Sequence, residues 1–159
     1  MRRKMMKNTV ELLSVVLFSL VFLAACTSVQ MKTYVGETKG INAELTYTYQ
    51  GDEVIKMSQT RTLNYKDLSL SKAEAENVFN PIQKRLDGLT GVDAEVEYKD
   101  NEAVLLVDID YDEADPKKVA KADAFTFLAK GESDVSMKTI EKNLKHSGYK
   151  EMKKNEKDD

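Results

Sequence analysis

The chain has 159 residues with a formal net charge of −3, and it contains one histidine, one cysteine and no tryptophan. This length suits one domain of ordinary size rather than two. A single cysteine excludes an internal disulfide framework and a cysteine-rich zinc site, and a single histidine excludes a multi-histidine metal cluster.

The amino terminus predicts an export signal over residues 1–25. Basic residues at positions 2, 3, 4 and 7 precede a largely apolar run of 12 residues from Leu12 to Leu23. A helix of 12 residues spans about 18 Å, whereas the hydrocarbon of a bilayer is about 30 Å thick. The run is therefore expected to be a cleaved signal peptide and not a lasting membrane span.

The end of this run, Leu23-Ala24-Ala25-Cys26, resembles the lipobox of bacterial lipoproteins. In those proteins the cysteine thiol takes a diacylglyceryl group, and the signal peptide is cleaved just before that cysteine. The resemblance implies lipidation of Cys26 and attachment to the extracytoplasmic face of the cell membrane. Two or three acyl chains hold a protein firmly, since each buried methylene contributes about 0.8 kcal/mol.

Removal of residues 1–25 takes away four basic residues and one acidic residue, so the net charge changes from −3 to about −6. An acidic domain is repelled by an anionic membrane surface and by nucleic acid. The expected partners are therefore the membrane, through the lipid alone, and an envelope protein or a small ligand, but no nucleic acid.

The mature chain is expected to have three parts. Residues 26–40 show no hydrophobic period and predict a lipidated cysteine followed by a flexible tether. Residues 41–149 predict the globular domain. Residues 150–159 are nearly all charged, which predicts a disordered tail.

Alternation of apolar and polar residues predicts a first β-hairpin over 41–65. A three-residue loop over 51–53 is expected, because it pairs Tyr49 with Ile55 and keeps both on the apolar face. Gln59 and Arg61 then fall on that same apolar face, so a bulge is expected near them.

A helix is predicted after this hairpin, because Ser71 and Glu74 have the spacing of a capping box and an apolar stripe follows. At Pro81 the unbroken stripe favours one helix kinked at 79–81 over a second short helix capped by Asn80. A second hairpin is predicted over 92–111, with a tight turn at 100–101 that places Asp93 opposite Asp108. Further helical segments are expected after Asp115 and after residue 136, whereas 124–130 fits a strand or a loop.

Together these elements predict an α+β fold, in which two hairpins form an antiparallel sheet and helices pack on one face within a single domain. The segments LTYTYQGDEVIKMSQTRTLNY and GVDAEVEYKDNEAVLLVDIDYDEAD, the capped helix between them and the final HSGYK resemble the YehR-like lipoproteins. The resemblance covers roughly residues 23–150 and implies an α+β fold and a lipid anchor. It implies no activity, and it carries over no functional residue except Cys26.

An acidic cluster raises the possibility of a cation site. Residues 108–119 begin like a calcium loop but have Glu113 and Val119 where that loop needs glycine and glutamate. Two interpretations stay open, a solvated acidic sheet face and a looser cation site. The cation site would use the four aspartates Asp93, Asp108, Asp110 and Asp112.

Candidate catalytic groups are sparse. A catalytic His146 would need a nucleophile and an orienting acid, and no serine or cysteine motif supplies them. Glu44, Glu95 and Glu97 fit strand-face carboxylates, and the chain has no tryptophan platform for a sugar. The sequence therefore predicts a non-enzymatic binding module of the cell envelope that needs no cofactor. An envelope hydrolase using sheet-face carboxylates and a calcium-dependent binding protein remain the alternatives.

Overall fold

The computed structural model describes residues 28–128 and 135–153, which form a six-stranded antiparallel sheet in the order β4-β5-β3-β2-β1-β6. The strands are β1 Val29–Thr38, β2 Ile41–Gln50, β3 Glu53–Asn64, β4 Val92–Tyr98, β5 Glu102–Asp110 and β6 Lys150–Glu151. The helices are α2 Lys72–Leu86, α3 Pro116–Ala122 and α4 Met137–His146, with a 3-10 turn, η2, over Ala124–Thr126.

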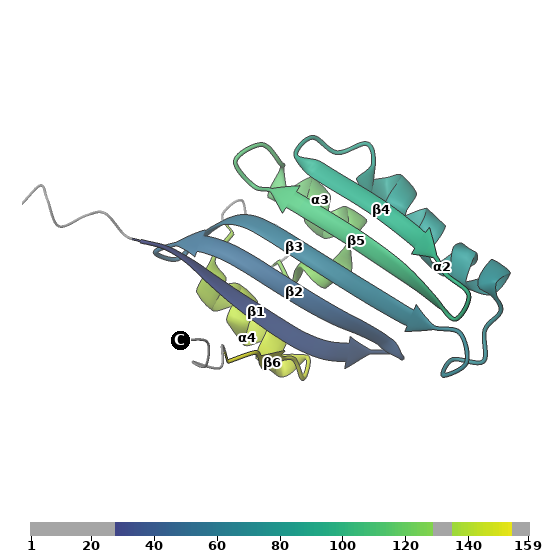
Figure 1. Ribbon diagram of the computed structural model, residues 1–159. Helices are drawn as coiled ribbons and strands as arrows, with labels where there is room; N and C mark the ends of the chain where they lie inside the picture. The colour runs from purple at the N-terminus through teal and green to yellow at the C-terminus, as the bar shows by residue number, and fades with distance from the viewer. Residues whose placement is uncertain (1–27, 129–134, 154–159) are drawn as a thin grey trace, which may run out of the picture.

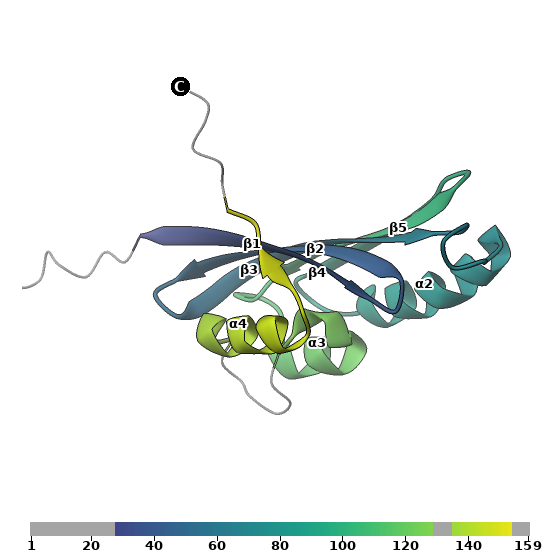
Figure 2. The same ribbon diagram turned by 90° about the horizontal axis from the view of Figure 1, so that it is seen from below.

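The helices pack against one face of the sheet, which confirms the predicted α+β fold in a single domain. Figure 2 shows the sheet nearly edge-on, with α3 and α4 beneath it and no helix above it among the described residues. The core lies between the two layers and includes Tyr47, Leu105, Phe79 and Ile140, all of which are essentially buried. The opposite face of the sheet, here called the open face, is left to solvent (Figures 1 and 2).

The predicted tether is wrong over Val29–Thr38, because this segment is strand β1. It pairs with β2 along its whole length and turns into it through Lys39 and Gly40, which both have positive φ. The strand lies next to the sheet edge and buries only Tyr34 fully, so its sequence lacks the apolar alternation of an inner strand. The first predicted hairpin is therefore part of a three-stranded meander, β1-β2-β3.

The loop of the first hairpin also differs from the prediction. Gln50 pairs with Glu53 and Tyr49 with Val54, so the connection is a two-residue turn at Gly51 and Asp52. A bulge follows directly, since Thr48 pairs with Lys56, and the extra residue keeps both Val54 and Met57 in the core. The predicted pairing of Tyr49 with Ile55 assumed an unbroken alternation, which the bulge interrupts.

No bulge occurs at the position predicted for it. Gln59 and Arg61 pair regularly with Leu45 and Ala43, and both point into the core. Both polar side chains can stay in the core because they bind the buried carboxylate of Asp123, as described below.

The second hairpin and the helices agree with the sequence. Tyr98 pairs with Ala103 and Asp93 with Asp108, as the turn at 100–101 predicts. Ser71 and Glu74 form the capping box of α2, which continues through Pro81. Asp115 caps α3, and Ser136 caps α4.

The predicted tail is wrong at its beginning. Lys150 and Glu151 form β6, which pairs with Val35 and Tyr34 of β1 and lies beside β1 in both ribbon views (Figures 1 and 2). The amide of Met152 continues this ladder by donating to the carbonyl of Thr33 at 2.8 Å. The rest of the predicted tail, residues 154–159, lies outside the described residues.

Candidate functional site

The predicted signal peptide and lipobox, including Leu23, Ala24, Ala25 and Cys26, lie outside the described residues. The described part of the chain starts at residue 28, and β1 begins at Val29, three positions after Cys26. No helix in residues 28–128 or 135–153 is long and apolar enough to cross a membrane.

The centre of the open face is a surface of hydroxyl groups. Its outward side chains on β2 and β3 include five serines and threonines, namely Thr46, Thr48, Ser58, Thr60 and Thr62. The hydroxyl of Thr46 lies 2.8 Å from that of Thr33 on β1. These hydroxyl groups make the centre of the open face polar, and no described helix covers them.

One side of the open face is strongly acidic. Six of the eight outward positions on β4 and β5 carry carboxylates, and we call this set the acidic edge. Its members are Asp93, Glu95, Glu97, Glu102, Asp108 and Asp110. Asp93 lies directly opposite Asp108, and like charges placed opposite each other on neighbouring strands cost stability.

Half of these six carboxylates have an ion-pair partner: Lys99 lies 3.8 Å from Glu97 and 3.2 Å from Glu102, and Lys56 pairs with Asp110. Lys56 Nζ lies 3.1 Å from Asp110, and this bond, followed by the backbone N–H of Asp112, holds the pKa of the Asp110 carboxyl below its ordinary value. The hydroxyl of Ser58 donates to Asp108. Within the described residues, neither Asp93 nor any other group of β4 upstream of Glu97 takes part in an ion pair.

A shallow groove of about 440 Å³ crosses the acidic edge where β3, β5 and β4 lie side by side. It brings together Asp93, Asp108 and Asp110 from the predicted cation set, together with Lys56 and Ser58, whereas Asp112 is not part of its lining. The described residues contain no group of three or more acidic, histidine or cysteine side chains arranged to hold a metal ion. The lysine in the groove occupies the place where a cation would balance Asp110.

The three glutamates considered for hydrolysis, Glu44, Glu95 and Glu97, do not lie together as one cluster. Glu44 lies on β2 and Glu95 on β4, in the same row but three strand spacings apart, which is about 14 Å. Paired carboxylates of glycosidases lie about 5–9.5 Å apart. Glu95 and Glu97, two residues apart on the same side of β4, are about 7 Å apart and fall in that range, but neither lines the groove of the acidic edge. His146 is exposed at the end of α4, on the helix side of the sheet, far from these acids.

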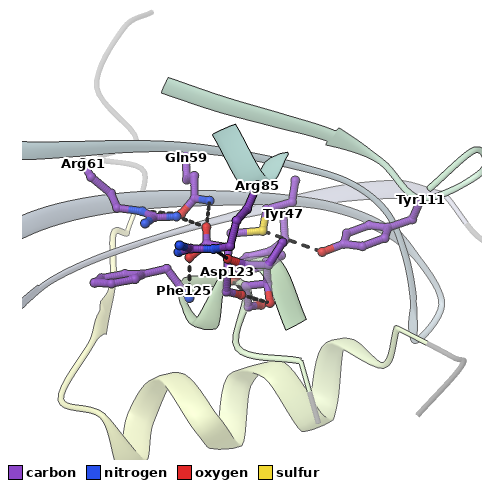
Figure 3. A network of polar contacts seen from close by, with 10 residues as sticks. Tyr47, Gln59, Arg61, Arg85, Tyr111, Asp123 and Phe125 are labelled. Atoms are coloured by element: carbon purple, nitrogen blue, oxygen red, sulfur yellow. Dashed lines mark hydrogen bonds and ion pairs between the residues drawn. The ribbon is translucent and has the colours of Figure 1, made fainter. Parts of the chain in front are cut away.

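A buried polar network that the sequence analysis missed lies on the other side of the sheet (Figure 3). The Arg61 guanidinium forms an ion pair with Asp123, and its Nε donates to Gln59 at 3.1 Å. Gln59 Nε2 in turn donates to Asp123 at 3.0 Å, and the guanidinium lies 4.2 Å from the ring centre of Phe125. The sequence offered one sign of this network: Gln59 and Arg61 are polar but occupy strand positions that point to the apolar face.

Arg61 has no exposed surface and Asp123 is 4% exposed, so the network is closed to solvent. Burial lowers the pKa of the Arg61 guanidinium to about 9, which leaves it charged at neutral pH. Its Nη1 has no hydrogen-bond partner within the part of the chain that the structure describes. The network therefore joins the segment between α3 and η2 to the sheet.

The fold and this surface define a small α+β domain with one face covered by helices and the other open and partly acidic. The chain belongs to the DUF1307 family, described as a protein of unknown function, whose profile matches residues 30–150. This agrees with the resemblance found in the sequence.

Two relatives carry names that describe lipoproteins. The chain is 30% identical over 152 residues to the uncharacterized lipoprotein Lmo0207 of Listeria monocytogenes, covering 95% of this chain and 99% of that protein. It is 28% identical over 143 residues to the uncharacterized lipoprotein YehR of Escherichia coli, covering 88% and 92%. The NMR structure of YehR superposes with a TM-score of 0.69 at 23% identity, covering 83% of this chain and 96% of YehR, which supports the fold.

Proposed function

We propose that this protein is a lipid-anchored, non-enzymatic binding module of the cell envelope, and that its acidic edge binds a basic segment of another envelope protein. The anchor would be a lipid on Cys26, which is supported by the pattern Leu23-Ala24-Ala25-Cys26 and by the lipoprotein names of the relatives. Attachment to a membrane raises the local concentration of the domain near other membrane proteins.

The observation that carries the binding proposal is the unbalanced charge of the acidic edge. Asp93 and Asp108 lie directly opposite each other on the adjacent strands β4 and β5, and both are exposed to solvent. Lysine or arginine side chains of a partner would relieve this repulsion and would form charge-assisted hydrogen bonds. Complementary charge of this kind speeds association and favours one partner over others.

Binding is favoured over catalysis by the surroundings of these acids. A carboxylic acid that works as a general acid near neutral pH needs its pKa raised by burial or by a neighbouring charge. The acids of the groove lie on an open sheet face, and the pKa of Asp110 is shifted downward by Lys56. These exposed surroundings support binding as the proposed function ahead of the hydrolase alternative.

The test removes negative charge from the acidic edge of the full-length protein in its native membrane and measures cross-linking to a partner. In the double variant Asp93→Asn/Glu95→Gln, the cross-linked yield of a membrane partner is expected to fall about tenfold, equivalent to about 1.4 kcal/mol. The matched control Asp67→Asn/Asp87→Asn removes the same charge from exposed positions after β3 and just after α2, and it should leave the yield unchanged. Equal yields from the two variants, at equal membrane amounts and melting temperatures, would refute the proposal.

A further inference from the structure

The exposed large apolar side chains of the described chain gather in one place, on the open face beside β6. They are Val29, Met31, Val35 and Met152, with exposed fractions of 58%, 62%, 36% and 50%. We call these four residues the apolar edge. No other large apolar side chain among residues 28–128 and 135–153 is classed as exposed.

The pairing of the strands places these residues on the same face. Val29, Met31 and Val35 alternate with Tyr34, which is buried, and with Lys32, which pairs with Glu141 of α4 on the helix side. Met152 donates its amide to Thr33, so it continues the β6 pairing opposite Thr33 and between Met31 and Val35. The four side chains therefore form a continuous strip along the outer side of β1.

The acidic edge lies at the opposite side of the same face. Four strand spacings separate β4 from β1, which is about 19 Å. Lys150 pairs with Val35 and adds a basic group beside the apolar edge, while Glu37 lies two residues beyond Val35 on the same face of β1. The open face thus changes from largely apolar at β1 and β6 to acidic at β4 and β5.

The distance to the anchor decides what covers the apolar edge. Cys26 precedes Val29 by three residues, and three residues reach about 10 Å even when fully extended. A lipid on Cys26 would therefore hold the start of β1 at the headgroups. Exposed valine and methionine side chains beside Lys150 suit that boundary, whereas the carboxylates concentrated at the acidic edge are repelled by anionic lipids.

We propose that the apolar edge rests on the bilayer surface, so that the domain stands on β1 and β6 and presents the acidic edge away from the membrane. This inference rests on the lipid anchor of the proposed function. It adds an orientation to that function, because the membrane and the partner would then use opposite sides of one face.

The experiment uses the full acylated protein in vesicles of phosphatidylethanolamine and phosphatidylglycerol. A polarity-sensitive fluorophore is attached to the single-cysteine variants Met31→Cys and Met152→Cys, since the lipid-bearing sulfur of Cys26 cannot react. Matched controls carry the label on the same face at Thr62→Cys in the centre and at Glu97→Cys on the acidic edge. Iodide probes access from water, and a nitroxide-labelled lipid probes contact with the bilayer.

Labels at positions 31 and 152 are expected to be quenched by iodide at least about fivefold less than the label at position 97, consistent with burial about 5–10 Å into the headgroup boundary. The nitroxide lipid should quench them strongly and should leave position 97 unaffected. Melting curves of the labelled variants verify that each one is folded.

Three outcomes would overturn the proposal. Equal iodide quenching at positions 31 and 97 in acylated protein would show a water-exposed apolar edge and would leave the anchor intact. Protection from iodide without quenching by the nitroxide lipid would assign the apolar edge to another protein chain. Absence of the acyl group from Cys26, seen by mass spectrometry, would refute the anchor and this orientation together.

Discussion

Arg61 carries a positive charge inside the core, where removing it from water costs several kcal/mol. Three contacts offset that cost: the ion pair with Asp123, the hydrogen bond to Gln59 and the stacking on Phe125. Because Asp123 directly follows α3, this one side chain connects the middle of the sheet to the helical layer. Its contribution is to fix the position of that segment.

Asp123→Asn is expected to lower the free energy of unfolding by about 3–5 kcal/mol, because it leaves the Arg61 charge buried without a counter-charge. Asparagine retains an oxygen that can accept from the backbone N–H of Phe125, as Asp123 does, so the local turn is preserved. The double variant Arg61→Met/Asp123→Asn should recover much of the loss in urea unfolding. A loss below about 1 kcal/mol in the single variant would contradict the assigned role of the pair.

At this scale the sequence identified the exposed acids but not the buried network. Asp93 and Asp108 were placed opposite each other correctly, because strand alternation is a local pattern. The partner of Arg61 lies 62 positions along the chain, and only the packing of η2 against the sheet brings it close. Two polar residues on an apolar face were therefore interpreted as a bulge.

Among the elements, the turn between β2 and β3 also serves as a cap for α4. Asp52 accepts from the backbone N–H of Lys138 at 2.9 Å and from the hydroxyl of Ser136 at 3.0 Å. The bond from Lys138, together with that from Ser136, holds the pKa of the Asp52 carboxyl below its ordinary value. A carboxylate at a helix start also interacts favourably with the helix dipole.

Asp52→Ala is expected to lower the free energy of unfolding by about 1 kcal/mol at pH 7, as the loss of a helix cap does. The pKa of Asp52 is lower in the folded state, so its contribution is complete above the unfolded pKa of about 4 and is lost as the pH falls through the folded pKa. Urea unfolding at pH 7 and pH 3 should show the gap to wild type narrowing in acid.

The matched control for this prediction is Asp67→Ala, an exposed acid in the turn after β3. It removes the same charge without removing a cap and is expected to change stability little. A gap between wild type and Asp52→Ala that stays constant from pH 7 to pH 3 would contradict the role assigned to the carboxylate.

The elements were predictable where apolar residues repeat without interruption, as in β4 and β5. Strand β1 was missed because its location near the edge leaves Tyr34 as its only fully buried side chain. The two-residue turn at Gly51 and Asp52 was missed because the bulge after it shifts the alternation by one residue. Both predictions were wrong because strand pairing, which decides the position of β1 and of the bulge, cannot be read from the residues of one segment.

On the scale of the whole molecule, the two faces of the sheet differ in character. Its helix-covered face holds the core and the Arg61 network, while the open face holds the acidic edge and the apolar edge at its two sides. In the proposed anchored state, this asymmetry would give the domain one preferred orientation at the membrane.

The anchor itself is tested by Cys26→Ser in cells labelled with a radioactive fatty acid. Label is expected to disappear from the variant, because serine lacks the thiol that takes the lipid, and the protein should be released or should keep residues 1–25. Thr27→Ser, the neighbouring conservative change, should retain the label. Undiminished labelling of Cys26→Ser would show that the lipid is attached elsewhere.

The immediate start of β1 after Cys26 also sets a limit on height. A sheet of six strands is about 24 Å wide, so a domain anchored at Cys26, with two residues between that cysteine and β1, would act within a few nanometres of the bilayer. Molecules held farther than that from the bilayer would be beyond its reach. In the proposed anchored state, a longer chain between positions 27 and 29 would let the sheet move farther from the bilayer.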